Sequence, residues 1–91
     1  MTTLPPDECW KPQIAPGTRL QMETAQNAWV LLYPEGMVRL NPSAAEILQR
    51  CDGTRGVAAI AAELEAQFQV QDLTPQVQDL VSEGARRGWI V

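Results

Sequence analysis

The chain has 91 residues, the size of one domain with a small core, and 45% of its residues are hydrophobic. Its net charge of −4 comes from seven basic and eleven acidic residues, and only two of the basic residues adjoin, which disfavours binding to nucleic acid. The sequence has no histidine, no CxxC pair, no long apolar run and no signal-peptide pattern. We therefore expect a cytoplasmic protein without metal, cofactor or membrane span.

Residues 1–16 hold four of the chain's seven prolines and predict an extended or flexible N-terminal arm. Trp10 and Ile14 are its only obvious anchors, and they can pack on the same domain, on a second copy or on a partner. An arm of this kind allows a monomer or a weak, swapped homodimer. Residues 17–91 are predicted to form the single folded domain.

Three short segments show the alternating pattern of β-strands, at residues 17–23, 28–33 and 37–40. The second segment carries apolar side chains on both faces, which indicates the central strand of three. Pro34 and Gly36 suit a tight turn between the second and third strands. Because the connections are short, we expect an antiparallel meander in which the third strand is an edge.

Three helices are predicted to follow the strands. Asn41 and Pro42 indicate a helix start, and Gly53 is the expected left-handed cap at its end. Thr54 is expected to cap the second helix and Thr74 the third. Apolar residues at helical spacing predict the inner faces of the three helices: Ala44, Ile47, Leu48 and Cys51, then Val57, Ile60, Ala61, Leu64 and Phe68, then Val77, Leu80, Val81, Gly84 and Ala85.

Gly88 is predicted to end the third helix, and the apolar residues 89–91 to fold back onto the core. The element order is therefore βββααα. This order predicts an α+β fold of winged-helix-turn-helix-like type, in which a three-stranded antiparallel sheet precedes three helices.

No catalytic constellation emerges, because the chain lacks a histidine base, a phosphate-binding loop and the common hydrolase motifs. Ser43 and Ser82 have no partner base, so we do not expect an enzyme. Three functions remain open: a peptide-binding module, a winged-helix DNA-binding regulator, and a small enzyme or sulfur carrier that uses Cys51. On the third helix, Asp79 and Glu83 balance the charges of the two arginines, which disfavours the DNA-binding regulator. Cys51 is predicted to be buried, which disfavours the enzyme or sulfur carrier.

Several segments together carry a family resemblance. They are LLYPEG at residues 31–36, Leu40-Asn41, Ala44, Ile47-Leu48, Cys51-Asp52-Gly53, Ile60, Leu64 and Arg87-Gly88-Trp89. In combination, over about residues 16–91, they resemble the PqqD family of pyrroloquinoline quinone biosynthesis. The resemblance implies a chaperone that binds the ribosomal precursor peptide PqqA and presents it to PqqE. PqqE is a radical S-adenosylmethionine enzyme that cross-links a Glu and a Tyr within that peptide.

The resemblance also implies where the peptide binds, as a strand added beside the third strand and packed against the third helix. An exposed edge strand is a ready template for such addition. The implied groove has two walls: Met37, Val38, Arg39, Leu40 and Asn41 on the strand side, and Leu80, Val81, Gly84 and Arg87 on the helix side. Members of the family often carry a large apolar residue at the position of Gly84, so the groove is expected to be wider or the helix softer there.

Overall fold

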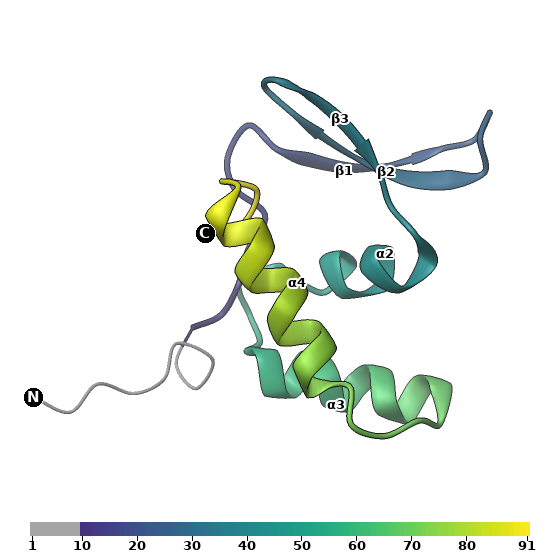
Figure 1. Cartoon of the computed structure of the whole chain (residues 1–91), viewed down its shortest axis with the longest axis vertical. Coiled ribbons are helices and arrows are strands. Elements are labelled where there is room, and N and C mark those ends of the chain that lie inside the picture. Colours follow the sequence, from purple (N-terminus) through teal and green to yellow (C-terminus); the bar gives the residue numbers. More distant parts are fainter. Residues whose placement is uncertain (1–9) are drawn as a thin grey trace, which may run out of the picture.

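The computed structural model describes residues 10–91, so Cys9 and the first part of the predicted arm lie outside the described residues. The elements are β1 (Arg19–Glu23), β2 (Ala28–Tyr33), β3 (Gly36–Arg39), α2 (Pro42–Gln49), α3 (Val57–Phe68) and α4 (Thr74–Arg86). The sheet forms one layer and the three helices lie on one side of it, with α4 rising toward the sheet (Figure 1). The predicted α+β order βββααα is confirmed.

The sheet is antiparallel with the strand order β1-β2-β3, so β2 is the central strand, as its two apolar faces predict. Leu20, Leu31 and Val38 lie opposite one another across the three strands. All three contact the core, and Leu31 is fully buried in it. Because successive side chains of a strand alternate between faces, this row identifies the face of the sheet that packs on the helices.

The core joins that sheet face to the inner sides of all three helices. Its fully buried helical side chains are Val57, Ile60, Val77 and Val81. Three of the predicted inner-face positions are wrong. Ala44 is only half-buried while its neighbour Ala45 is buried, and both Phe68 and Ala85 are exposed, at or near the ends of their helices.

The helix boundaries follow the predicted caps only in part. The Asn41 side chain accepts a hydrogen bond from the N–H of Ala44 at 2.7 Å, as expected of a capping residue. The prediction for Thr54 is wrong, because its hydroxyl and its N–H both donate to the Asp52 carboxylate and Gly56 occupies the cap position of α3. Thr54 therefore takes part in a local turn with Asp52 and does not cap α3.

Two further cap predictions are also revised. Gly53 has the predicted left-handed backbone, with φ +82°, but α2 has already ended at Arg50, and the N–H of Gly53 donates to the Pro12 carbonyl. Thr74 is the first residue of α4, and the cap position falls on Leu73. The Glu65 carboxylate accepts a hydrogen bond from the N–H of Leu73 at 3.0 Å, so α3 supports the start of α4.

Residues 10–15 run extended between the turn that follows α2 and the C-terminal tail. Gln13 exchanges two backbone hydrogen bonds with Val91, at 2.8 and 3.1 Å, and the N–H of Ala15 donates to the Trp89 carbonyl at 2.8 Å. The Trp10 indole N–H donates to the Val91 carbonyl as well. The described part of the predicted arm thus packs on its own domain, and the tail folds back as predicted.

Within residues 10–91, no helix has the length and apolar character needed to cross a membrane.

Candidate functional site

The free edge of β3 presents unpaired backbone groups. Leu40 donates its N–H to the Trp29 carbonyl at 2.9 Å, so these two residues form a hydrogen-bonded pair. Hydrogen-bonded pairs alternate along an antiparallel ladder, which makes Val38 the next residue to face β2. The N–H and C=O groups of Met37 and Arg39 therefore point away from the sheet. Since β3 pairs with β2 alone within residues 10–91, this edge has open donors and acceptors in the described part of the chain.

The five predicted residues of the strand wall have different surroundings. Met37 is 52% exposed and Arg39 is exposed, whereas Val38 and Leu40 are half-buried and pack against the core. Asn41 is exposed, but its side-chain oxygen is engaged as the cap of α2. The strand wall is thus one exposed backbone edge with two side chains directed to each face.

The four predicted residues of the helix wall divide into two pairs. Leu80 is half-buried and Arg87 is exposed, so both offer side chains to the surface. Val81 is fully buried, and Gly84 is covered by Ile90, whose Cδ1 atom lies only 2.7 Å from where a Cβ at position 84 would be. Neither of these two presents a side chain to a groove, and Gly84 instead leaves room for the C-terminal tail.

An aromatic contact joins the end of β2 to the tail that follows α4. The rings of Tyr33 and Trp89 have centroids 5.5 Å apart and are tilted by 38°. The Arg87 guanidinium lies 5.2 Å from the centre of the Trp89 ring and is also paired with Glu83. The sequence analysis does not place Tyr33 or Trp89 in the groove, although both lie within the motifs that carry the family resemblance.

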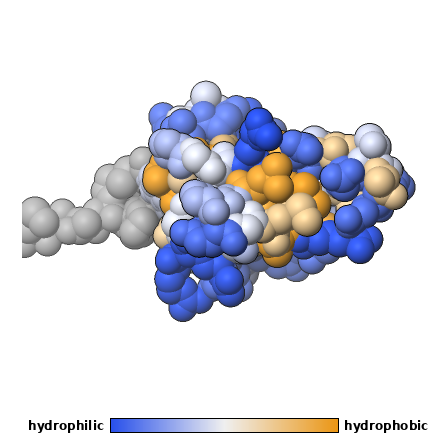
Figure 2. Space-filling model, turned by 90° about the horizontal axis from the view of Figure 1, so that it is seen from above, coloured by the Kyte–Doolittle hydropathy of each residue, from blue (hydrophilic) through white to orange (hydrophobic). Residues whose placement is uncertain are grey.

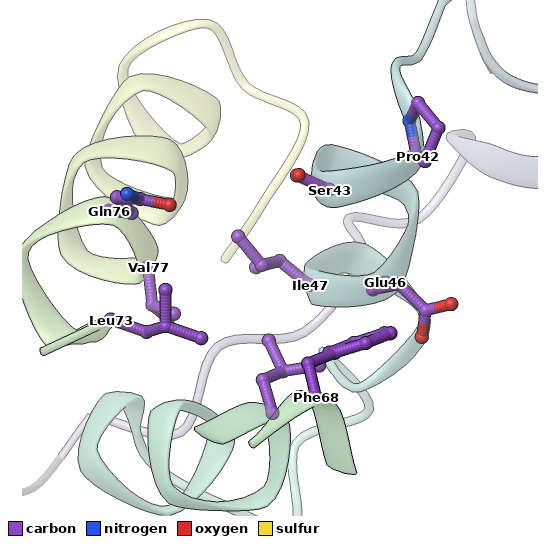
Figure 3. A pocket seen from close by; sticks show the side chains of 9 residues that line it. Pro42, Ser43, Glu46, Ile47, Phe68, Leu73, Gln76 and Val77 are labelled. Carbon is purple, nitrogen blue, oxygen red and sulfur yellow. The ribbon is translucent and has the colours of Figure 1, made fainter. Parts of the chain in front are cut away.

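A hollow lies among the helices, between α2, the end of α3 and the start of α4 (Figure 3), and it has a volume of about 220 Å³. Its lining residues are Pro42, Ser43, Glu46, Ile47, Leu64, Phe68, Leu73, Gln76 and Val77. Ser43 and Gln76 face each other across the gap, with the half-exposed Phe68 ring on the α3 side. None of the nine predicted residues lines this helix pocket, although Pro42 directly follows Asn41.

Most arginines of the helical layer are neutralised locally. Arg50 pairs with Glu46 at 2.9 Å, and Arg55 pairs with Glu63 at 2.8 Å. Arg86 and Arg87 both pair with Glu83. Within residues 10–91, the cations without an ion pair are Lys11, Arg19 and Arg39. The surface of α4 therefore offers no basic stripe to a phosphate backbone.

Cys51 is buried, as predicted, and its thiol donates to the Ile47 carbonyl at 3.4 Å. Burial and, to a smaller extent, the Asp52 charge raise the pKa of the Cys51 thiol to about 12. The thiol is thus protonated at neutral pH and shielded from reagents, which argues against a sulfur carrier. Hydrogen bonds from Thr54 hold the pKa of the Asp52 carboxyl below its usual value. Residues 10–91 contain no cluster of three potential metal ligands.

Comparison with known proteins gives a consistent set of relatives. The family described as coenzyme PQQ synthesis protein D (PqqD) matches residues 28–90. A PqqA binding protein of Azotobacter vinelandii is 49% identical over 80 residues, which cover 87% of each chain. One of Methylococcus capsulatus is 38% identical over 78 residues, which cover 86% of this chain and 84% of the relative.

A solved structure shares the fold. It is the solution NMR structure of the PqqD truncation of Methylobacterium extorquens PqqCD, described as a functional and stand-alone recognition element for ribosomally synthesized and post-translationally modified peptides. The TM-score is 0.70 at 26% identity, over 88% of this chain and 87% of the other.

Proposed function

Because this chain belongs to the PqqD family, we propose that it binds the ribosomal precursor peptide PqqA and holds it as an added strand along β3. The observation that carries the proposal is the open edge, at which Met37 and Arg39 direct their backbone N–H and C=O groups outward. A peptide strand satisfies these groups by main-chain hydrogen bonds, which supply affinity without demanding one sequence.

Side-chain contacts then supply the sequence preference. Every second residue of an added strand faces the helices. On that side the peptide meets Val38 and Leu40 from the strand and Leu80 from α4, which are all half-buried apolar side chains at the margin of the core. Arg87, over the ring of Trp89, adds a cation at the α4 end that can pair with an acidic residue of the peptide.

The protein itself performs no chemistry in this proposal. It presents PqqA to the radical S-adenosylmethionine enzyme PqqE in the cytoplasm, where the ribosome supplies the peptide. The packing of residues 10–15 on their own domain supports a monomer as the binding unit.

Isothermal titration calorimetry with synthetic PqqA tests the proposal. We expect micromolar or tighter affinity, about −8 kcal/mol or more favourable. A scrambled peptide of the same composition serves as the control and is expected to bind at least tenfold more weakly, a difference of about 1.4 kcal/mol. No heat of binding with the cognate peptide, in a sample shown to be folded by circular dichroism, would rule the proposal out.

A winged-helix DNA-binding regulator is the competing function. Both arginines at the end of α4 are paired with Glu83, so contact with phosphates requires breaking these ion pairs. Fluorescence anisotropy with labelled duplex DNA at physiological salt is expected to show only weak, sequence-independent binding. A sequence-specific nanomolar complex would favour the regulator instead.

A further inference from the structure

On the face of the sheet that points away from the helices, two cross-strand rows span all three strands. Arg19, Leu32 and Met37 form one row, and Gln21, Val30 and Arg39 form the other. These six residues, here named the outer sheet face, have the opposite parity to the core-facing row of Leu20, Leu31 and Val38.

The outer sheet face has an apolar centre formed by Met37, which is 52% exposed, and the half-buried Leu32 opposite it. Arg19 lies opposite Leu32 on the other side, and Arg39 follows Met37 two residues along β3. Val30, in the next row, is only 1% exposed, because the long side chains of Gln21 and Arg39 beside it can cover it with their alkyl parts. Seen from above the sheet, hydrophobic atoms gather in the middle of the molecule and hydrophilic atoms surround them (Figure 2).

The same face holds two cations without an acidic partner. Arg19 and Arg39 form no ion pair within residues 10–91, whereas Arg50, Arg55, Arg86 and Arg87 all do. Glu23, on the same side of β1, forms no ion pair with them. In a chain of net charge −4, an apolar centre flanked by unpaired arginines is complementary to a surface on which carboxylates flank an apolar patch.

We propose that the outer sheet face docks a protein surface on which carboxylates flank an apolar patch, and that this surface belongs to the enzyme that receives the peptide. The proposal rests on the proposed function through β3, which contributes Met37 and Arg39 side chains to this face and their backbone groups to the peptide edge. A peptide strand added there directs every second side chain to the outer side. An enzyme seated on the face therefore contacts the presented peptide directly.

Two other occupants fit less well. A second copy that paired through this face about a two-fold axis would bring the arginines of one copy toward those of the other, which is unfavourable without intervening carboxylates. Nucleic acid requires more cations than the two available here. Charge complementarity thus favours an acidic protein surface.

The test uses Arg19→Glu, because Arg19 lies on β1, away from the peptide edge of β3. Lys11→Glu is the matched control, since it makes the same charge change at another exposed residue that forms no ion pair within residues 10–91. The affinity for purified PqqE is measured by calorimetry in the presence of saturating PqqA, and the affinity for PqqA alone is measured separately. Gln21→Glu is the second variant, which adds a negative charge to the same face with little change in shape.

We expect Arg19→Glu and Gln21→Glu to weaken PqqE binding, by about tenfold for the charge reversal, and to leave PqqA affinity within about twofold. Lys11→Glu is expected to leave both affinities unchanged. Added salt should weaken PqqE binding more in the wild type than in Arg19→Glu.

Wild-type affinity for PqqE in both folded face variants overturns the docking proposal, and so does the absence of PqqE binding to the wild type. Loss of self-association in the variants, seen by analytical ultracentrifugation, assigns the face to a homodimer and also overturns it. If PqqA fails to bind the wild type, the proposed function falls, and measurement with PqqE alone still decides whether the face docks the enzyme.

Discussion

Gly84 is the residue at which α4 and the C-terminal tail approach most closely. A Cβ at this position would lie 2.7 Å from Cδ1 and 3.1 Å from Cγ1 of Ile90. The Gly84 carbonyl also accepts hydrogen bonds from the N–H groups of Trp89 and Ile90. Because Ile90 is itself buried, it has little room to move aside, and the absent side chain at position 84 is a packing requirement of the tail.

We predict that the effect of Gly84→Ala changes sign with the residue at position 90. In the wild type the new Cβ overpacks the tail and lowers the free energy of unfolding by about 1–2 kcal/mol. In an Ile90→Ala background the clash is absent, and the higher helix propensity of alanine raises the free energy of unfolding by up to about 1 kcal/mol. Urea unfolding of the four proteins measures both effects. A stabilising effect of the same size in both backgrounds would show that Ile90 is not the constraint.

We predict that the buried Cys51 thiol makes the free energy of unfolding sensitive to alkaline pH. Burial raises the pKa of its thiol from 9.0 to about 12 in the folded state, so its contribution to stability is complete below pH 9. Above pH 9 the unfolded thiol ionises while the folded thiol stays protonated. The free energy of unfolding is therefore expected to fall by up to about 1.4 kcal/mol per pH unit from this group as the pH rises toward 12.

The measurement compares the wild type with Cys51→Ala by urea unfolding between pH 7 and pH 11, because other groups titrate equally in both proteins. The stability advantage of the wild type is expected to shrink above pH 9. An advantage that stays constant across this range would show that the thiol does not titrate differently on unfolding.

At the scale of the elements, the hydrogen-bond parity of β3 decides which backbone groups are available. Val38 and Leu40 donate toward β2, and Met37 and Arg39 donate outward. The sequence predicts the strand and its position at the edge but not this parity. Parity depends on which residues of β2 lie opposite, and this register is a property of the pair of strands.

We predict that proline substitutions along β3 separate folding from peptide binding. Val38→Pro removes a donor from the ladder with β2 and is expected to unfold the domain. Met37→Pro and Arg39→Pro remove only outward donors, so they are expected to fold and to lose more than tenfold in PqqA affinity, about 1.4 kcal/mol. Circular dichroism and calorimetry measure the two properties.

Met22→Pro provides the matched control on the opposite edge. In the observed register Met22 directs its N–H away from β2 on the free side of β1, so this variant is expected to fold and to bind PqqA normally. Normal binding in both Met37→Pro and Arg39→Pro would exclude strand addition at β3. The helix pocket between α2, α3 and α4 would then be the next surface to test.

At the scale of the whole molecule, the two ends of the described chain hold each other in place. Residues 12–15 and 89–91 pair through backbone hydrogen bonds, and Ile90 fills the core beneath them at 3% exposure. The Pro12 carbonyl also accepts a hydrogen bond from the N–H of Gly53, which attaches the turn after α2 to the N-terminal segment. The C-terminal tail therefore stabilises the N-terminal segment and α4 together.

We predict that Ile90→Ala lowers the free energy of unfolding by about 3 kcal/mol, because it leaves a cavity where the tail enters the core. Val91→Ala is the control, since Val91 is 57% exposed and contributes mainly backbone bonds, and it is expected to change stability by less than about 0.5 kcal/mol. Urea unfolding measures both, and hydrogen exchange of the Gln13 and Ala15 amides should accelerate in Ile90→Ala only. Equal stability of the two variants would show that the tail is not part of the core.

The amino-acid sequence alone determined the element order, the central place of β2 and the family. These features depend on local patterns: alternation in strands, helical spacing at residues such as Ile60 and Leu64, and turn residues such as Pro34 and Gly88. The nine implied peptide-binding residues came from the resemblance, and they stay a prediction. The tertiary structure decided which of them offer a surface, because Val81 is buried in the core and Gly84 lies beneath Ile90 of the folded-back tail.

Only the tertiary structure also brought Tyr33 to Trp89, tied residues 10–15 to the tail, and placed Arg19 and Arg39 beside one apolar centre. Each of these depends on pairing between segments that no local pattern links. A strand's alternation predicts which side chains share a face, but the neighbours of that face are set by strand register and helix packing. Local chemistry thus determined the elements, and non-local packing determined the surfaces they form.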